Sequence, residues 1–149
     1  MITVHFTVRP GQGDPSGFDL GDMSVTGDLG TADSAGRTPD QGMMIHLSVT
    51  QLLDSLGTLL RGHGRTVTFT GVDTSFALVF RRTRDGVSVA SEDGVIARTT
   101  PGELASAVLG AAEALSLTLP TGDPAASDCA DALAAFRPLV SRPGPGGAH

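Results

Sequence analysis

The chain has 149 residues and a formal net charge of −6, and its strong bases are arginines without a single lysine. The length, with 40% hydrophobic but only 4% aromatic residues, indicates one domain whose core is built mainly from Leu, Val and Ala. The acidic charge balance speaks against general affinity for nucleic acid or for membranes, and it favours a basic protein partner.

The sequence carries no sign of export or membrane insertion. Cys129 is the only cysteine and cannot form an internal disulfide. No signal-peptide-like segment opens the sequence, and no apolar run reaches the length of a membrane span. We therefore expect a cytoplasmic protein.

The N-terminal part predicts one clear strand followed by a loop-rich segment. Apolar and polar residues alternate over residues 2–8, which is the period of a strand with one buried face. Gly, Asp, Thr and Ser then dominate, with short strand candidates at "FDLGDMSV" (18–25) and "MMIHL" (43–47). We expect an acidic, Gly/Asp-rich loop around 26–42, mobile over most of its length.

A helix should follow from Ser48. Ser48 and Gln51 have the spacing of a capping box, and Gly62 and Gly64 should end the helix. Its leucines fall on a single stripe, made of Leu52, Leu53, Leu56, Leu59 and Leu60.

Residues 65–98 predict a four-stranded antiparallel meander. Turns are indicated around Val72-Asp73, at Asp85-Gly86 and at Asp93-Gly94. Directly paired residues share a face of a sheet, so loops of two or four residues place the large side chains on one side, with Phe69 opposite or near Phe76. These side chains are Val67, Phe69, Phe76, Leu78, Phe80, Val87, Val89 and Ile96.

Two further helices are indicated by their first residues. Thr100 is placed as an N-cap, Pro101 at the first helical position, and Glu103 completes a capping box. Asp123 and Pro124 open the next helix in the same way.

The elements add up to one α+β domain over residues 1–140. Pro138 should end the last helix, and residues 141–149 should form a disordered tail. We expect an antiparallel meander sheet of about six or seven strands, including the N-terminal strand, packed by two to three helices.

Three arginines, Arg81, Arg82 and Arg84, lie at the end of the second strand of the meander. Arg82 and Arg84 continue the face of the large side chains, Arg81 points to the other side, and Arg98 lies near the same end through the third hairpin. One interpretation, to which we give the greater weight, is that these charges solvate a hairpin end and guard it against sheet-to-sheet pairing. The other is an anion-binding site formed by Arg82, Arg84 and Arg98.

The acidic excess lies between residues 14 and 40. One interpretation is a solvated loop whose aspartates favour turns, and another of equal weight is a recognition surface for a basic protein. A calcium loop is not favoured, because the spacing does not follow D-x-D-x-D-G. The candidate partner-binding residues are Asp19, Asp22, Asp28, Asp33 and Asp40.

No constellation of residues indicates catalysis. His5 and His46 occupy polar positions of strands and are expected on the surface, and the histidine and cysteine spacings do not match a zinc site. Cys129 lies on an alanine-rich helix and is expected to be a buried thiol. We expect no catalytic residue, no metal site and no cofactor.

The order of elements resembles a known class of proteins. The helix "SVTQLLDSLGTLL", the meander "TVTFTGVDTSFALVFRRTRDGVSV" and the helix "PGELASAVLGAAEAL" make residues 43–118 similar in layout to small immunity-type α+β proteins that accompany bacterial polymorphic toxins. The resemblance implies a stoichiometric binder that occludes the active site of a toxin, and it assigns no residues.

Three functional hypotheses remain open. The first is a non-enzymatic protein-binding module, such as an immunity protein that neutralises a partner toxin by occluding it. The alternative is a small enzyme or an anionic-ligand-binding protein that uses the arginine-rich end of the sheet. The third is a homo-oligomer that pairs through an exposed sheet face.

Overall fold

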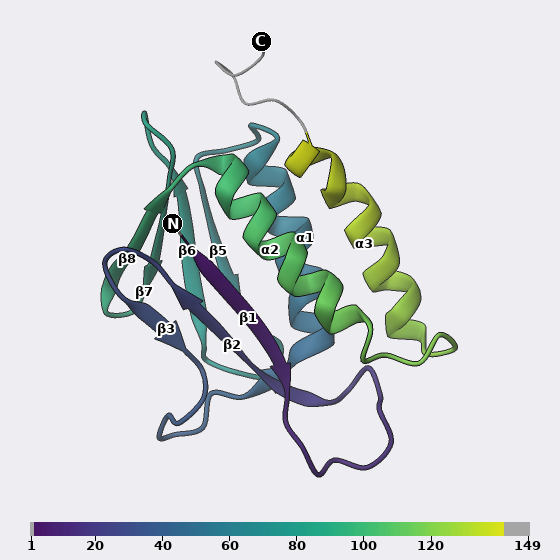
Figure 1. Ribbon diagram of the computed structural model, residues 1–149. Coiled ribbons are helices and arrows are strands. Elements are labelled where there is room, and N and C mark those ends of the chain that lie inside the picture. Colours follow the sequence, from purple (N-terminus) through teal and green to yellow (C-terminus); the bar gives the residue numbers. More distant parts are fainter. Residues whose placement is uncertain (1, 142–149) are drawn as a thin grey trace.

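The computed structural model describes residues 2–141, which form two antiparallel sheets and three helices (Figure 1). The first sheet contains β1 (Thr3–Val8), β2 (Leu20–Thr26), β3 (Thr31–Asp33) and β4 (Met43–Met44). The second contains, in spatial order, β5 (Thr66–Thr70), β6 (Ala77–Arg82), β7 (Val87–Ser91) and β8 (Gly94–Thr99). The helices are α1 (Ile45–Leu60), α2 (Pro101–Ser116) and α3 (Pro124–Ser141).

The expected α+β class, with antiparallel strands packed by helices, is confirmed. The strands are divided between two sheets, however, and are not collected in one. A tail is expected over residues 141–149; Ser141 is instead the last residue of α3, and residues 142–149 lie outside the described residues.

The alternating pattern of β1 and β2 buries one face of the first sheet. Val4 pairs with Val25 and Phe6 pairs with Met23, and all four side chains are buried. Between them His5 is exposed, as expected. The first strand and the first of the two short strand candidates are therefore confirmed.

The turn between β2 and β3 joins the two sheets. The backbone N–H of Leu29 donates to the carbonyl of Ile96 at 2.9 Å. The backbone N–H of Arg98 donates to the carboxylate of Asp28 at 3.1 Å. The turn thus lies along the edge of β8. Within the segment 26–42, which was expected as a mobile loop, residues 31–33 form β3.

The meander over residues 65–98 is confirmed. Val67 pairs with Phe80, and Phe69 pairs with Leu78 rather than lying opposite Phe76, because six residues connect β5 to β6. The shift is an even number of residues, so the same side chains remain on one face. All of the expected large side chains are buried except Val67, which is half-buried.

Helix α1 begins at Ile45, so the capping box predicted at Ser48 is wrong. The apolar stripe already includes Ile45 and Val49, both fully buried, and packing of this face extends the helix backward to Ile45. Of the strand candidate "MMIHL", Met43 and Met44 form β4, and the other three residues begin the helix. The hydroxyl of Ser48 accepts a hydrogen bond from the N–H of Val72 at 2.8 Å instead, which ties the helix to the turn after β5.

The first turns of α2 and α3 follow the sequence prediction. The N–H of Glu103 donates to the hydroxyl of Thr100 at 3.1 Å, as a capping box requires. The N–H of Ala125 donates to the carboxylate of Asp123 at 2.9 Å, and Pro124 is the first helical residue. The buried residues of α3 include Cys129, Leu133 and Phe136.

Pro138 lies inside α3 and does not end it, contrary to the prediction. A proline removes one backbone hydrogen-bond donor and crowds the preceding helical turn, which destabilises a helix. Pro138 is only three residues from the end of α3, so it disturbs the last turns alone. Arg61, directly after α1, donates to the carbonyl of Ala135 at 2.7 Å and so contacts the turn that precedes Pro138.

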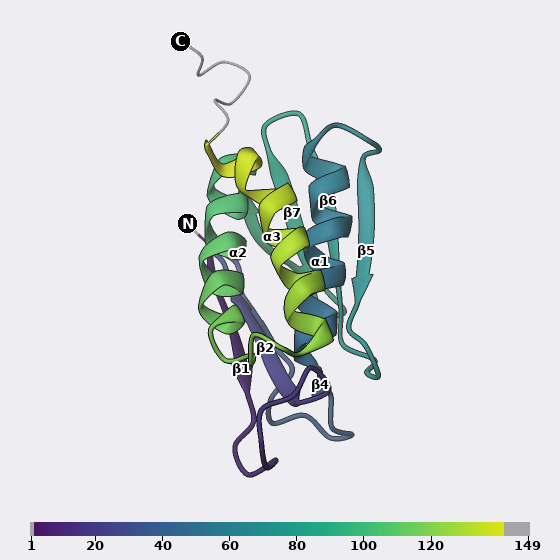
Figure 2. The ribbon, with the colours of Figure 1, turned by 90° about the vertical axis from the view of Figure 1, so that its right-hand side faces the viewer.

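The helices lie against both sheets (Figure 2). α3 contacts α1 and α2, while α1 packs on β5 and α2 packs on β1. Within residues 2–141, none of the helices has both the length and the apolar character needed to cross a membrane.

Candidate functional site

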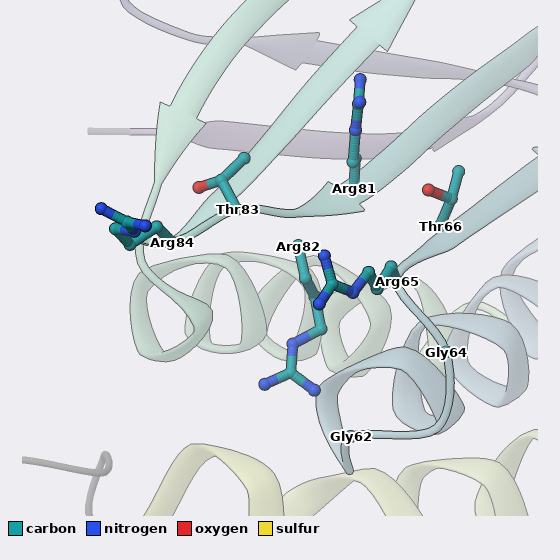
Figure 3. Close-up of a pocket in the computed structure, with 8 residues that line it drawn as sticks. All are labelled: Gly62, Gly64, Arg65, Thr66, Arg81, Arg82, Thr83 and Arg84. Carbon is teal, nitrogen blue, oxygen red and sulfur yellow. The ribbon is translucent and has the colours of Figure 1, made fainter.

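A large open depression lined by arginines lies at one end of the second sheet (Figure 3). Its volume is about 1030 Å³. Four guanidinium groups and two hydroxyl groups contribute to its lining. We call this set the arginine basin: Arg65, Arg81, Arg82, Arg84, Thr66 and Thr83.

A chain reversal after α1 brings these residues together. Gly62 and Gly64 have φ angles of 95° and 91°, in the left-handed region that favours glycine. The chain can therefore turn back sharply into Arg65. The N–H of Arg82 donates to the carbonyl of Arg65 at 2.7 Å, so the start of β5 lies beside the end of β6.

Successive arginines of β6 lie on opposite faces of the sheet. Arg82 pairs with Val87 on the core side, and its Nη1 donates to the carbonyl of Leu59 at 3.4 Å, in the last turn of α1. Arg81 pairs with Ser88, and Figure 3 shows its side chain directed away from Arg82. The basin thus surrounds the end of β6 and is not a single converging clamp.

The basin arginines form no salt bridge within the described chain. Between residues 2 and 141, the salt bridges are made by Arg9 and Arg137, and none involves a basin arginine. All four basin arginines are exposed. Their like charges produce a local positive potential on a protein whose net charge is negative.

The three arginines considered as an anion site do not gather at one place. Arg82 and Arg84 line the basin. Arg98 pairs with Ser88 from the other side of β7, which puts it on the same face as Arg81. Arg98 borders a separate, smaller depression.

Sequence reasoning did not include Arg65 in the site. The register of the first hairpin is the signal that could have found it, because the pairing of Val67 with Phe80 puts residue 65 beside Arg82. Arg81 was correctly placed on the opposite face but was not recognised as part of the same depression.

The acidic segment is organised by Arg9. Its guanidinium donates to Asp22 from Nε at 2.9 Å and from Nη2 at 3.0 Å, and to Asp40 from Nη1 at 2.9 Å and from Nη2 at 2.8 Å. Ser34 donates a further hydrogen bond to Asp22 at 2.8 Å. The hydrogen bonds from Arg9 hold the pKa of both carboxyl groups below the usual range, and the pKa of Arg9 is raised in turn.

The remaining candidate aspartates are used in turns and lie apart. Asp19 accepts from the N–H of Ser16, and Asp33 accepts from the N–H of Ala35. Asp28 lies beyond the opposite end of β2 from Asp19, against β8. The five acids are therefore spread over the first sheet, and two of them are neutralised locally by Arg9.

His46 is buried, contrary to the expected surface position. It is the second residue of α1, it is 1% exposed, and neither ring nitrogen has a hydrogen-bond partner in the described chain. The prediction was wrong because the helix begins at Ile45 and turns position 46 inward. Burial lowers the pKa of the imidazole, which favours the neutral ring.

The other groups with reactive potential do not assemble into a site. Cys129 is a buried free thiol, as expected, and burial raises its pKa. His63 is exposed in the turn after α1. The residues that the structure describes contain no group of three or more His, Cys, Asp or Glu side chains placed to hold a metal ion.

Comparison with known proteins returned no match among family models, curated proteins or solved structures.

Proposed function

We propose that the protein is a non-enzymatic binding module and that the arginine basin is its contact surface. The observation that carries this proposal is the placement of four exposed guanidinium groups around one open depression, none of them in a salt bridge within the described chain. Carboxylates and phosphates match the planar donor geometry of guanidinium groups. An acidic segment of a partner protein therefore fits the basin.

An immunity-type role is a special case of this proposal. Occluding the active site of a toxin requires a stable complex and no chemistry, which agrees with an open contact surface. In that case the basin would bind acidic residues around the active site of the toxin.

A second candidate is a basic partner bound by the acidic segment. Its supporting observation is the double ion pair of Arg9, which fixes the segment between β1 and α1 before any partner arrives. A preformed surface loses less conformational entropy on binding than a mobile loop. The aspartates outside the ion pairs, Asp19, Asp28 and Asp33, would supply the contacts.

Two charged probe peptides separate these candidates. Fluorescence anisotropy with labelled poly-glutamate should show binding that weakens with salt, and the double variant Arg82→Gln/Arg84→Gln should lose most of it. Arg98→Gln removes an exposed arginine outside the basin and is the matched control, for which binding should change little.

Poly-lysine tests the second candidate in the same assay. The variant Asp19→Asn/Asp28→Asn/Asp33→Asn should lose poly-lysine binding if the acidic segment is the contact surface.

The arginine basin is refuted as a contact surface if poly-glutamate fails to bind, or if it binds the double arginine variant as tightly as the unmodified protein.

A further inference from the structure

We infer that strand β5 is a self-complementary edge through which two copies of the chain join their second sheets around a two-fold axis. This goes beyond the proposed function: the edge of β5 borders the arginine basin and shares Arg65 and Thr66 with it, but what binds there is a second copy of the chain. β5 is the terminal strand of its sheet. Figure 2 shows it as the outermost element on its side, with no helix or strand beyond it.

The hydrogen-bond pattern defines which backbone groups point outward. The N–H of Arg82 donates to the carbonyl of Arg65, and the N–H of Gly71 donates to the carbonyl of Phe76. Residues 65 and 71 therefore face β6. In an antiparallel ladder the facing residues alternate, so the backbone groups of Thr66, Thr68 and Thr70 point away from the sheet.

These outward groups have no partner in residues 2–141. No other strand pairs with β5 on that side, and the three threonine side chains are exposed. The strand is five residues long, and it contains no proline or charged residue that would discourage pairing. Threonine, valine and phenylalanine all favour strands.

The sequence of β5, "TVTFT", matches itself when a second copy runs antiparallel. In the register centred on Thr68, Thr68 lies opposite Thr68 of the second copy, and Thr66 lies opposite Thr70. All pairs on the outer face are then Thr–Thr pairs, which are favourable across strands. On the inner face Val67, which is half-buried, lies opposite Phe69 of the second copy and gains apolar cover.

Opposite charges at the two ends of β5 also favour the antiparallel pairing of two copies. Arg65 precedes β5 and Asp73 lies just beyond its other end, and both are exposed. Neither makes a salt bridge within the described part of the chain. An antiparallel second copy brings its Asp73 to the end where the first copy carries Arg65, and the two-fold axis repeats this contact.

Cysteine cross-linking in the full chain tests the register directly. Thr68→Cys should form a disulfide-linked dimer under mild oxidation, because paired residues of neighbouring strands lie within disulfide reach. Thr66→Cys changes the same residue type on the same face. In this register, however, residue 66 lies opposite Thr70 of the second copy and far from residue 66, so this variant should not form a disulfide. The native Cys129 is buried and should not interfere.

Sedimentation velocity supplies the second measurement. The unmodified chain should sediment as a dimer at high concentration, and Thr68→Pro should raise the dissociation constant by about tenfold or more, because it removes an outward N–H donor from each copy. Circular dichroism should show that this variant keeps its fold. A chain that stays monomeric at the highest attainable concentration would overturn the inference, as would equal cross-linking of the two cysteine variants.

Discussion

Arg9, directly after β1, donates two hydrogen bonds to the carboxylate of Asp22 on β2, at 2.9 and 3.0 Å. The side chain of Asp22 is 14% exposed, while that of Asp40, the second partner of Arg9, is 63% exposed. Ion pairs that are largely withdrawn from water are screened less than exposed ones. The Arg9–Asp22 pair should therefore be the more important contact for stability.

Replacing Asp22 by Asn should lower the free energy of unfolding by about 1–2 kcal/mol, because a charge-assisted double hydrogen bond is lost. Asp14→Asn is the matched control, since Asp14 is exposed in the loop between β1 and β2, and its effect should be small. Urea denaturation followed by circular dichroism measures both. Equal effects of the two variants would show that the ion pair contributes nothing to stability.

The contribution of Asp22 should depend on pH. Because Arg9 keeps the pKa of Asp22 below its ordinary value, the pair stabilises the fold above the pKa of the unfolded chain, about 3.9, and this stabilisation is lost as the pH falls through the folded pKa. The stability gap between the unmodified protein and Asp22→Asn should thus be constant near neutral pH and close below about pH 4. Urea titrations at a series of pH values check this, and a gap that persists in acid would contradict it.

The sequence was sufficient for elements that depend on local signals. The meander followed from turn residues and from the parity of the hairpins, and the start of α2 followed from Thr100 and Glu103. The division into two sheets was not predictable in the same way. The pairing of β1 with β2 and the docking of the next turn on β8 depend on contacts between residues far apart in the chain.

Short segments that fit two periods were the least predictable. "MMIHL" reads equally well as a strand or as a helix start, because five residues are too few to distinguish a period of 2 from 3.6. In the structure Met43 and Met44 form the short strand β4, while packing of Ile45 and Val49 places the other three residues in the helix. This turns His46 into the interior. For the arginine basin, Arg82 and Arg84 were found from the hairpin, while Arg65 required the strand register.

His46 should make the protein less stable as the pH falls below neutral. Burial lowers the pKa of its imidazole, so the unfolded chain takes up a proton near pH 6.5 before the folded chain does. Stability is then complete above about pH 6.5 and declines as the pH falls further. The carboxylates of Asp19 and Asp123 act in the opposite direction and limit the effect.

Replacing His46 by Leu should remove this pH dependence between about pH 6.5 and 5 and should leave stability at neutral pH equal or higher, because no buried ring nitrogen remains without a partner. Thermal unfolding across this pH range measures the effect. His5→Leu, at an exposed position of β1, is the control and should keep the pH profile of the unmodified protein. An unchanged profile in His46→Leu would show that His46 is not the group that titrates.

The contact between the two sheets can be tested with a substitution at Gly27, in the turn between β2 and β3. A Cβ atom at this position would overlap the Cβ of Ala97 and the carbonyl oxygen of Ile96, so Gly27→Ala must push the turn away from β8. We expect a loss of about 1–3 kcal/mol in the free energy of unfolding, the usual cost of overpacking. Chemical denaturation provides the measurement.

Gly110 offers the matched control for this substitution. It lies at an exposed position within α2, and a Cβ atom added there would meet open space. Gly110→Ala should therefore raise stability by about 0.5–1 kcal/mol through higher helix propensity. The two substitutions should therefore change the free energy of unfolding in opposite directions. If Gly27→Ala left stability unchanged, the turn between β2 and β3 would not rest on the edge of β8 in solution.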